Sequence, residues 1–128
     1  MYDRILVPID GSPTSERALA EAAGLARLCS ATLRLLHVMD PLMHITGYER
    51  PEVFVREIEP ALRKAAQDLL AKARDRVAGE RVKVETALVD SVGQRVSDII
   101  LDQAAAWPAD LIVIGTHGRR GVDRVLMG

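Results

Sequence analysis

Two hydrophobic periods alternate along this chain. Short runs rich in branched apolar residues, with one run of more alternating character, predict strands at residues 4–9, 32–38, 82–89 and 111–114. Between these runs, apolar residues recur at helical spacing, which predicts helices over residues 13–30, 53–78 and 96–104. The chain therefore has the predicted order β-α-β-α-β-α-β.

The connections carry recognisable start and stop signals. Asp10-Gly11-Ser12-Pro13 ends the first strand, with Ser12 suited to an N-cap and Pro13 to the first helical position. Residues 39–52 contain Pro41, Gly47 and Pro51 and predict a long loop. Gly79 ends the second helix, and a turn at 90–93 precedes the third helix.

The second helix has a predicted apolar face and a solvated charged face. Pairs at i and i+4, Glu59 with Arg63 and Asp68 with Lys72, would each contribute about 0.3 kcal/mol. The residues expected to face the core are Phe54, Ile58, Leu62, Ala65, Leu69, Ala73 and Val77. Cys29, on the apolar side of the first helix, is expected to act as a small buried hydrophobic residue.

Strands that alternate with helices favour an α/β fold, a parallel sheet with helices on both faces, because parallel neighbours need crossover connections. Ligands of such sheets bind beyond the carboxyl ends of the strands, where the winding reverses. Special chemistry follows two strands: Asp10-Gly11-Ser12 after the first and a glycine-rich segment after the fourth. If both line one crevice, strands one and four are neighbours and the order is 3-2-1-4.

The glycine-rich segment reads Gly115-Thr116-His117-Gly118-Arg119-Arg120-Gly121. Glycine lets a backbone amide approach a ligand closely, and successive amides can cradle a phosphate. Gly115 and Gly118 either donate to phosphate or only allow a turn, whereas Gly121 is interpreted as structural. Arg119 and Arg120 either neutralise phosphate or are solvated, and His117 either bonds phosphate or is a surface residue.

Composition narrows the function classes. The 128 residues are enough for one domain, and a net charge of −1 gives no field to gather nucleic acid or an anionic membrane. The first nine residues lack the pattern of a signal peptide, and no apolar run is long enough to span a membrane, so a cytoplasmic protein is expected. Aromatic residues are scarce, which predicts an aliphatic core.

The sequence lacks the signatures of an efficient enzyme. It has no Gly-x-x-x-x-Gly-Lys-Ser/Thr loop, no nucleophile elbow and no carboxylate pair identifiable as acid and base, so no catalytic residue is assigned. His37 and His44 are not spaced as metal ligands, and no metal site is predicted. These observations favour binding over turnover.

The residues Ile5-Leu6-Val7-Pro8-Ile9-Asp10-Gly11-Ser12, the strand end His37-Val38, and the spacing of Gly115, Gly118 and Gly128 resemble the universal stress protein family, ATP-binding type. The resemblance covers the whole chain. It implies a three-layer α/β/α fold of the adenine-nucleotide α-hydrolase-like, Rossmann-like kind, a cytoplasmic homodimer, and ATP as ligand, with or without magnesium. The positions that match the family's nucleotide site are Pro8, Ile9, Asp10, Ser12, Val38, Gly115, His117, Gly118, Arg119 and Gly128.

Each matched residue keeps its simpler interpretation. Asp10 either holds a turn, as Asp-Gly pairs do, or contacts the ribose or a metal, as the resemblance implies. Val38 would contact adenine through its backbone, but by itself it is only a strand residue.

The resemblance has one departure. The family motif continues from its last glycine into Ser or Thr, then into a last helix and a fifth strand, whereas Gly128 is the last residue given. We therefore expect a single domain over residues 1–128 that lacks the C-terminal helix and the fifth strand. Either the sequence given is truncated or partly ordered, or the edge of strand four is left open. Because an open edge invites pairing with another chain, truncation or incomplete ordering is expected.

Three functions remain open at this point. The first is a nucleotide-binding regulatory module of the stress response, in which ATP biases dimerisation or partner contacts. The second is a slow ATP hydrolase or self-phosphorylating protein that uses the same crevice. The third is a family member that binds no nucleotide and acts only through protein contacts.

Overall fold

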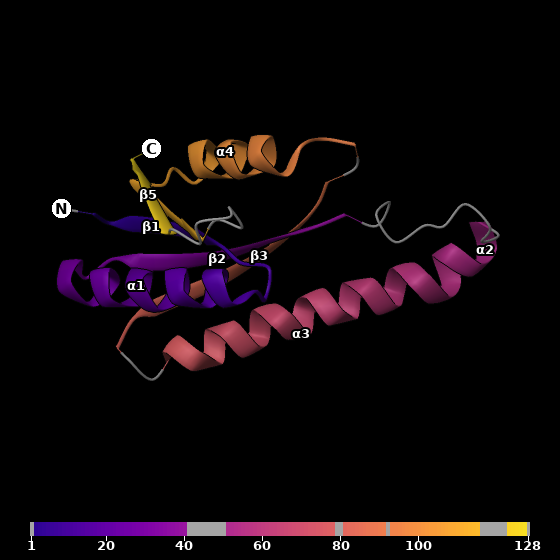
Figure 1. The fold of residues 1–128 in the computed structure, drawn as a ribbon, viewed down its shortest axis with the longest axis horizontal. Coiled ribbons are helices and arrows are strands. Elements are labelled where there is room, and N and C mark those ends of the chain that lie inside the picture. Colours follow the sequence, from indigo (N-terminus) through magenta and orange to yellow (C-terminus); the bar gives the residue numbers. More distant parts are fainter. Residues whose placement is uncertain (1, 41–50, 79–80, 92, 116–122, 128) are drawn as a thin grey trace.

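A central sheet organises the protein (Figure 1). The structure, a computed structural model, describes residues 2–40, 51–78, 81–91, 93–115 and 123–127. Within these ranges the sheet has the order β3-β2-β1-β4-β5, and β3, β2, β1 and β4 are parallel. The bounds are Arg4–Pro8 for β1, Thr32–Met39 for β2, Lys83–Asp90 for β3, Leu111–Gly115 for β4 and Asp123–Met127 for β5. The predicted order 3-2-1-4 is confirmed.

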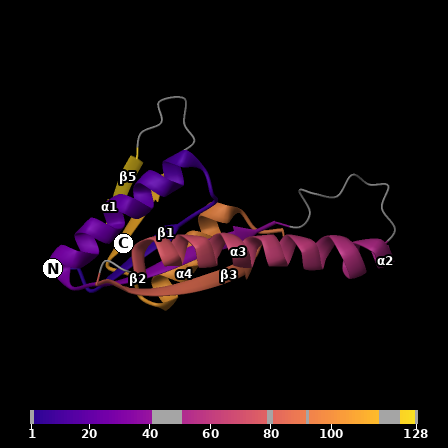
Figure 2. The same ribbon diagram turned by 90° about the horizontal axis from the view of Figure 1, so that it is seen from below.

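Helices cover both faces of the sheet. α1 (Pro13–Cys29) and α3 (Glu59–Ala78) lie side by side on one face, as Figure 2 shows, and α4 (Val96–Ala106) covers the other face (Figure 1). The predicted three-layer α/β/α architecture is therefore confirmed. α3 follows a short helix, α2 (Pro51–Val53), and a π-helical turn, η2 (Phe54–Ile58), so the helical segment begins at Pro51 rather than Val53.

The core is aliphatic, as the composition predicts. Between the sheet and the α1–α3 layer, fully buried strand residues such as Val7, Leu35 and Val113 meet small residues of α1. Because α1 presents alanines, its backbone approaches the sheet closely; these residues are Ala18, Ala22, Ala23 and Ala26. The α4 layer packs Ile100 and Ala104 against Leu6, Leu36 and Ile112. The partly buried Cys29 packs at the margin of the α1 core, short of the burial predicted for it.

The predicted apolar face of α3 is confirmed in part. Val77 is buried, and Leu69 and Ala73 pack against the core, as predicted. Ala66 and Leu70 are also buried, whereas Ala65, predicted to face the core, is exposed. The ion pair of Glu59 with Arg63 is present, at 2.7 Å between nitrogen and oxygen. Asp68 pairs with Lys64 at 3.1 Å instead of with Lys72. Either neighbour at i±4 can reach Asp68, so spacing alone does not select one.

The sheet has a further strand that the sequence analysis did not predict. β5 runs antiparallel along β4, with Gly115 opposite Asp123 and Leu111 opposite Met127. The short connection explains the direction, because a parallel return would need a crossover of a dozen or more residues. β5 precedes Gly128, so it is not the family strand expected after that residue, and it pairs with the edge of β4.

Candidate functional site

The carboxyl ends of β1 and β4 diverge at the point where the sheet reverses its winding. From β1 the chain continues into α1 on one face, whereas β4 is reached from α4 on the other face. Parallel sheets bind ligands at such a point. Five predicted site residues meet at this edge of the sheet: Pro8, Ile9, Asp10, Ser12 and Gly115.

Short polar side chains order the connection from β1 to α1. The Ser12 amide donates to Asp10 Oδ1 at 2.9 Å, and Gly11 between them adopts a left-handed φ of 83°. Ser12 caps α1, since its Oγ accepts from the Ser15 amide at 3.2 Å. Both sequence expectations for this stretch, an Asp-Gly turn and a Ser12 N-cap, are thus confirmed.

The first turn of α1 offers few free donors to a phosphate. The amides of Ser12 and Ser15 are already bonded, and Pro13 has no N–H. The connection instead presents oxygens, because the Asp10 carboxylate is exposed and Ser12 Oγ lies 3.0 Å from Thr14 Oγ1. A carboxylate beside a hydroxyl pair suits the hydroxyls of a sugar better than the oxygens of a phosphate.

Gly115 is required by a close approach of backbone. A Cβ atom at this position would overlap the Thr14 carbonyl and would lie 2.9 Å from the Ser15 amide nitrogen. The end of β4 therefore packs directly against the first turn of α1. This contact gives Gly115 a structural reason that neither sequence interpretation, a phosphate donor or a turn, had named, and it fixes the end of β4 against the start of α1.

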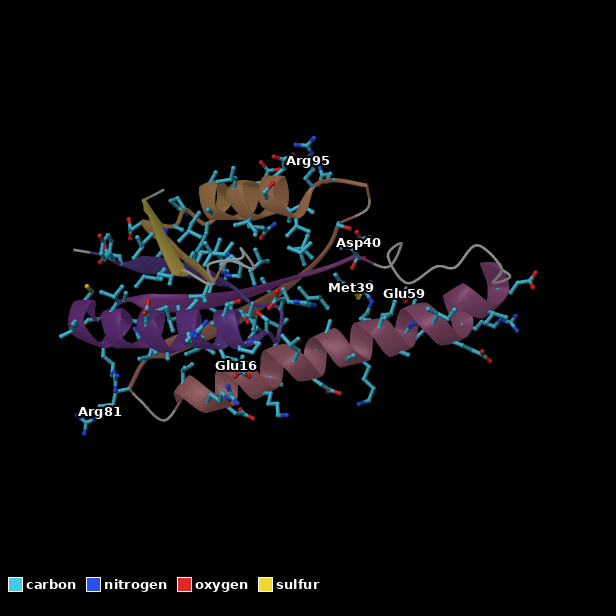
Figure 3. The ribbon with its side chains drawn as sticks, viewed as in Figure 1. Glu16, Met39, Asp40, Glu59, Arg81 and Arg95 are labelled. Carbon is cyan, nitrogen blue, oxygen red and sulfur yellow. The ribbon has the colours of Figure 1, made fainter. Side chains whose placement is uncertain are left out.

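The backbone of Val38 faces this same edge. The Leu36 carbonyl accepts from the Ile9 amide at 2.8 Å, and the Met39 carbonyl accepts from the Ser91 amide at 2.9 Å. Because successive residues of a strand direct their backbone groups to opposite sides, the N–H and C=O of Val38 point toward the β1 side. The β1–β2 register ends at Leu36, so these two groups lie beyond the last β1 partner (Figure 3 labels Met39, the next residue).

Three residues of the site were missed in the sequence. His37 Nδ1 lies 2.7 Å from the Ile9 carbonyl and must carry the proton there, because a carbonyl only accepts. Buried Ser15 donates from Oγ to the Ser12 carbonyl at 3.1 Å, and its Oγ lies 3.4 Å from the Asp10 amide. Thr14 adds the hydroxyl beside Ser12. The run Ser12-Pro13-Thr14-Ser15 was a usable signal for the hydroxyl cluster, whereas the His37 bond depends on strand pairing.

The end of β3 is stabilised differently. Arg63 of α3 contacts Asp90 at 2.9 Å and Glu59 at 2.7 Å, and the hydrogen bonds to Asp90 and then Glu59 raise the pKa of the guanidinium. Asp90 Oδ1 and Ser91 Oγ are buried and have no hydrogen-bond partner among the residues that the structure describes. This side of the carboxyl edge therefore depends on a long side chain from α3 and retains unused bonding capacity.

Four predicted site residues, His117, Gly118, Arg119 and Gly128, lie outside the described residues. The phosphate cradle predicted for this segment stays a prediction.

A search of the described ranges found neither a helix long and apolar enough to cross a membrane nor a group of three His, Cys, Asp or Glu side chains that could hold a metal ion.

Comparison with known proteins identifies the family. The model of the universal stress protein family matches residues 1–128. Universal stress protein YxiE of Bacillus subtilis is 32% identical over 133 residues, covering 100% of this chain and 88% of that protein. A crystal structure of a universal stress family protein from Burkholderia pseudomallei has 34% identity and a TM-score of 0.75, over 91% of this chain and 83% of that one.

The structure of the universal stress protein from Archaeoglobus fulgidus in complex with dAMP has 29% identity and a TM-score of 0.63, over 89% of this chain and 81% of that one. The family match spans the whole chain, and the order of the four parallel strands agrees with the order expected for that family. This chain belongs to the universal stress protein family.

Proposed function

We propose that this protein binds ATP at the carboxyl edge of β1, β2 and β4 and acts as a nucleotide-dependent regulatory module of the stress response. The observation that carries the proposal is the Val38 backbone, whose donor and acceptor face the edge where β1 has ended. An adenine presents an amino donor beside a ring acceptor on its Watson–Crick edge, which complements a C=O and N–H of one strand residue. The dAMP bound by the A. fulgidus relative supports an adenine nucleotide as the ligand class.

In this arrangement the ribose lies over the β1–α1 connection. The exposed Asp10 carboxylate and the Ser12–Thr14 hydroxyl pair supply its acceptors and donors. The phosphates then extend toward the segment after β4, where His117, Gly118 and Arg119 are the proposed partners and magnesium accompanies the triphosphate. Gly128 is a further proposed partner. Homodimerisation and a cytoplasmic location are part of the same proposal.

Calorimetric titration of the protein with ATP and Mg²⁺ tests the ligand. We expect micromolar affinity for ATP and weaker binding of GTP, because guanine presents its donor and acceptor in the opposite order. Asp10→Asn keeps an oxygen for the Ser12 amide and removes the charge, so the turn persists while ATP affinity falls about tenfold. Asp110→Asn, the same change at the opposite end of the sheet, is the matched control and leaves the affinity unchanged. Failure of the wild type to bind ATP would refute the proposal.

A second function uses the same crevice, as a slow ATP hydrolase or self-phosphorylating protein. It is separated from the first by incubating the ATP complex for hours and analysing the products. Intact ATP supports the regulatory module. Released ADP identifies a hydrolase, and phosphate retained on the protein in mass spectrometry identifies self-phosphorylation.

A further inference from the structure

A cavity of about 340 Å³ lies between α1 and α3, and it borders the proposed nucleotide edge at Ile9 and Ser15, whereas neither Val38 nor Gly115 lines it. Figure 2 shows the two helices side by side, and in Figure 3 Glu16 of α1 lies between them. Its volume is at the lower end of the range for small-molecule sites. Its lining is mainly apolar, with Leu19 from α1 and Leu69 and Ala73 from α3.

The charged side chains around this cavity are not equivalent. Glu16 and Arg76 neutralise each other across the two helices, at 3.1 Å between Oε1 and Nη1. Asp68 is paired with Lys64 at 3.1 Å. Lys72, which also lines the cavity, forms no hydrogen bond or ion pair with the part of the chain that the structure describes. One uncompensated positive charge therefore lies beside an apolar surface.

We propose that this cavity is a second ligand site, for a small amphipathic carboxylate. The aliphatic body covers Leu19, Leu69 and Ala73, and the carboxylate pairs with the Lys72 ammonium. Burying the aliphatic body contributes in proportion to the apolar area removed from water, and the single charge sets the polarity of the ligand.

The position of the cavity links it to the β1–α1 connection. Ile9, Gly11 and Ser15 line it together with α3, and a Cβ atom on Gly11 would lie 3.1 Å from Leu69 Cδ1. A ligand that displaces the Leu69 side chain therefore acts next to the turn formed by Asp10 and Ser12. The test with octanoate uses no nucleotide, so its outcome is separate from that of the ATP titration.

Octanoate is the probe, because it has one carboxylate and a short aliphatic chain, and neutral octanol is its matched control. Saturation-transfer NMR on the full chain measures both. We expect octanoate to bind the wild type saturably. Ala65→Phe should abolish the binding of both octanoate and octanol, because exposed Ala65 lines the cavity and a larger side chain there fills it. Thermal unfolding of this variant shows that it is folded.

Lys72→Gln tests the contact with the carboxylate head group. It should weaken the affinity for octanoate about tenfold and change the affinity for octanol by less than about twofold. Lys83→Gln, on β3 and absent from the cavity lining, is the charge-matched control and should change neither. Absence of octanoate binding to the wild type, or binding that Ala65→Phe leaves intact, would overturn the site. Equal loss of octanoate and octanol in Lys72→Gln would overturn the carboxylate assignment.

Discussion

Each end of the sheet has an aspartate whose carboxylate accepts hydrogen bonds from backbone amides. One aspartate bonds locally, whereas the other bonds to residues far away in the sequence. At the carboxyl end, Asp10 accepts from Ser12, two residues along the chain, at 2.9 Å. At the amino end, Asp110 Oδ2 accepts from Asp3 at 2.7 Å and from Arg4 at 2.8 Å, more than a hundred residues away. The first bond shapes a local turn, whereas the second ties the start of β1 to the segment that leads into β4.

The amino end is further closed by contacts between segments far apart in sequence. Arg34 Cζ lies 4.4 Å from the centroid of the Trp107 ring, and Arg4 Nη1 donates to the Trp107 carbonyl at 3.1 Å. Arg34 also donates to Glu85 on the neighbouring strand at 2.8 Å. The amino end thus uses its polar groups to hold strands together. At the carboxyl end the exposed Asp10 shapes a local turn, and the Val38 backbone faces the side where β1 has ended. This difference explains why one end is suited to a ligand.

The largest expected effect tests the close backbone contact at the carboxyl end. Gly115→Ala places a methyl group against the Thr14 carbonyl and should lower the free energy of unfolding by about 3 kcal/mol. Urea denaturation followed by circular dichroism measures it. Gly24→Ala is the matched control, because its methyl group would meet only the Arg27 side chain at 4.0 Å. It should stabilise α1 by up to about 1 kcal/mol, since alanine is the better helix former. Equal effects in both variants would contradict the contact.

A smaller effect compares two buried serines at the carboxyl end. Ser15 Oγ donates to the Ser12 carbonyl, so Ser15→Ala should cost about 1 kcal/mol. Ser91 Oγ is buried with no partner among the described residues, so Ser91→Ala should leave stability unchanged within about 0.5 kcal/mol or raise it. Both variants are measured by urea denaturation. A clear loss in Ser91→Ala would show that its hydroxyl is bonded in solution, and the contrast between the ends of β1 and β3 would then fail.

The strands and most helix limits could be predicted because they depend on local patterns. The Ser12-Pro13 start of α1 was predicted as observed, because capping and a fixed proline φ act within one turn. The strand order followed from one physical rule, that two loops with special chemistry share a switch point. The structure confirms that β1 and β4 are neighbours.

The rest depended on contacts between distant segments. The exact limits of the buried face of α3 are decided by how α3 packs, so Ala66 is buried and Ala65 is exposed. β5 forms because β4 offers an unpaired edge, and its short apolar run was not read as a strand. The Asp110 bonds to Asp3 and Arg4 join the two ends of the chain, and no spacing rule connects positions that far apart.

The smallest expected effect is the pH dependence of the amino end. Amides of Asp3 and Arg4, in that order, hold the pKa of the Asp110 carboxyl below its usual 3.8. A lowered folded pKa means that the charged form stabilises the fold above the usual pKa, and that this contribution is lost as the pH falls through the lowered value.

Asp110→Asn removes the charge and should lower the urea midpoint by a constant amount from neutral pH down to about pH 5, with the difference from wild type shrinking below about pH 4. Asp98→Asn, an exposed carboxylate in the first turn of α4, is the control. A constant difference down to the lowest pH would mean that the charge of Asp110 adds nothing beyond its two hydrogen bonds. The amino end would then be held by the same neutral geometry that shapes the turn at Asp10.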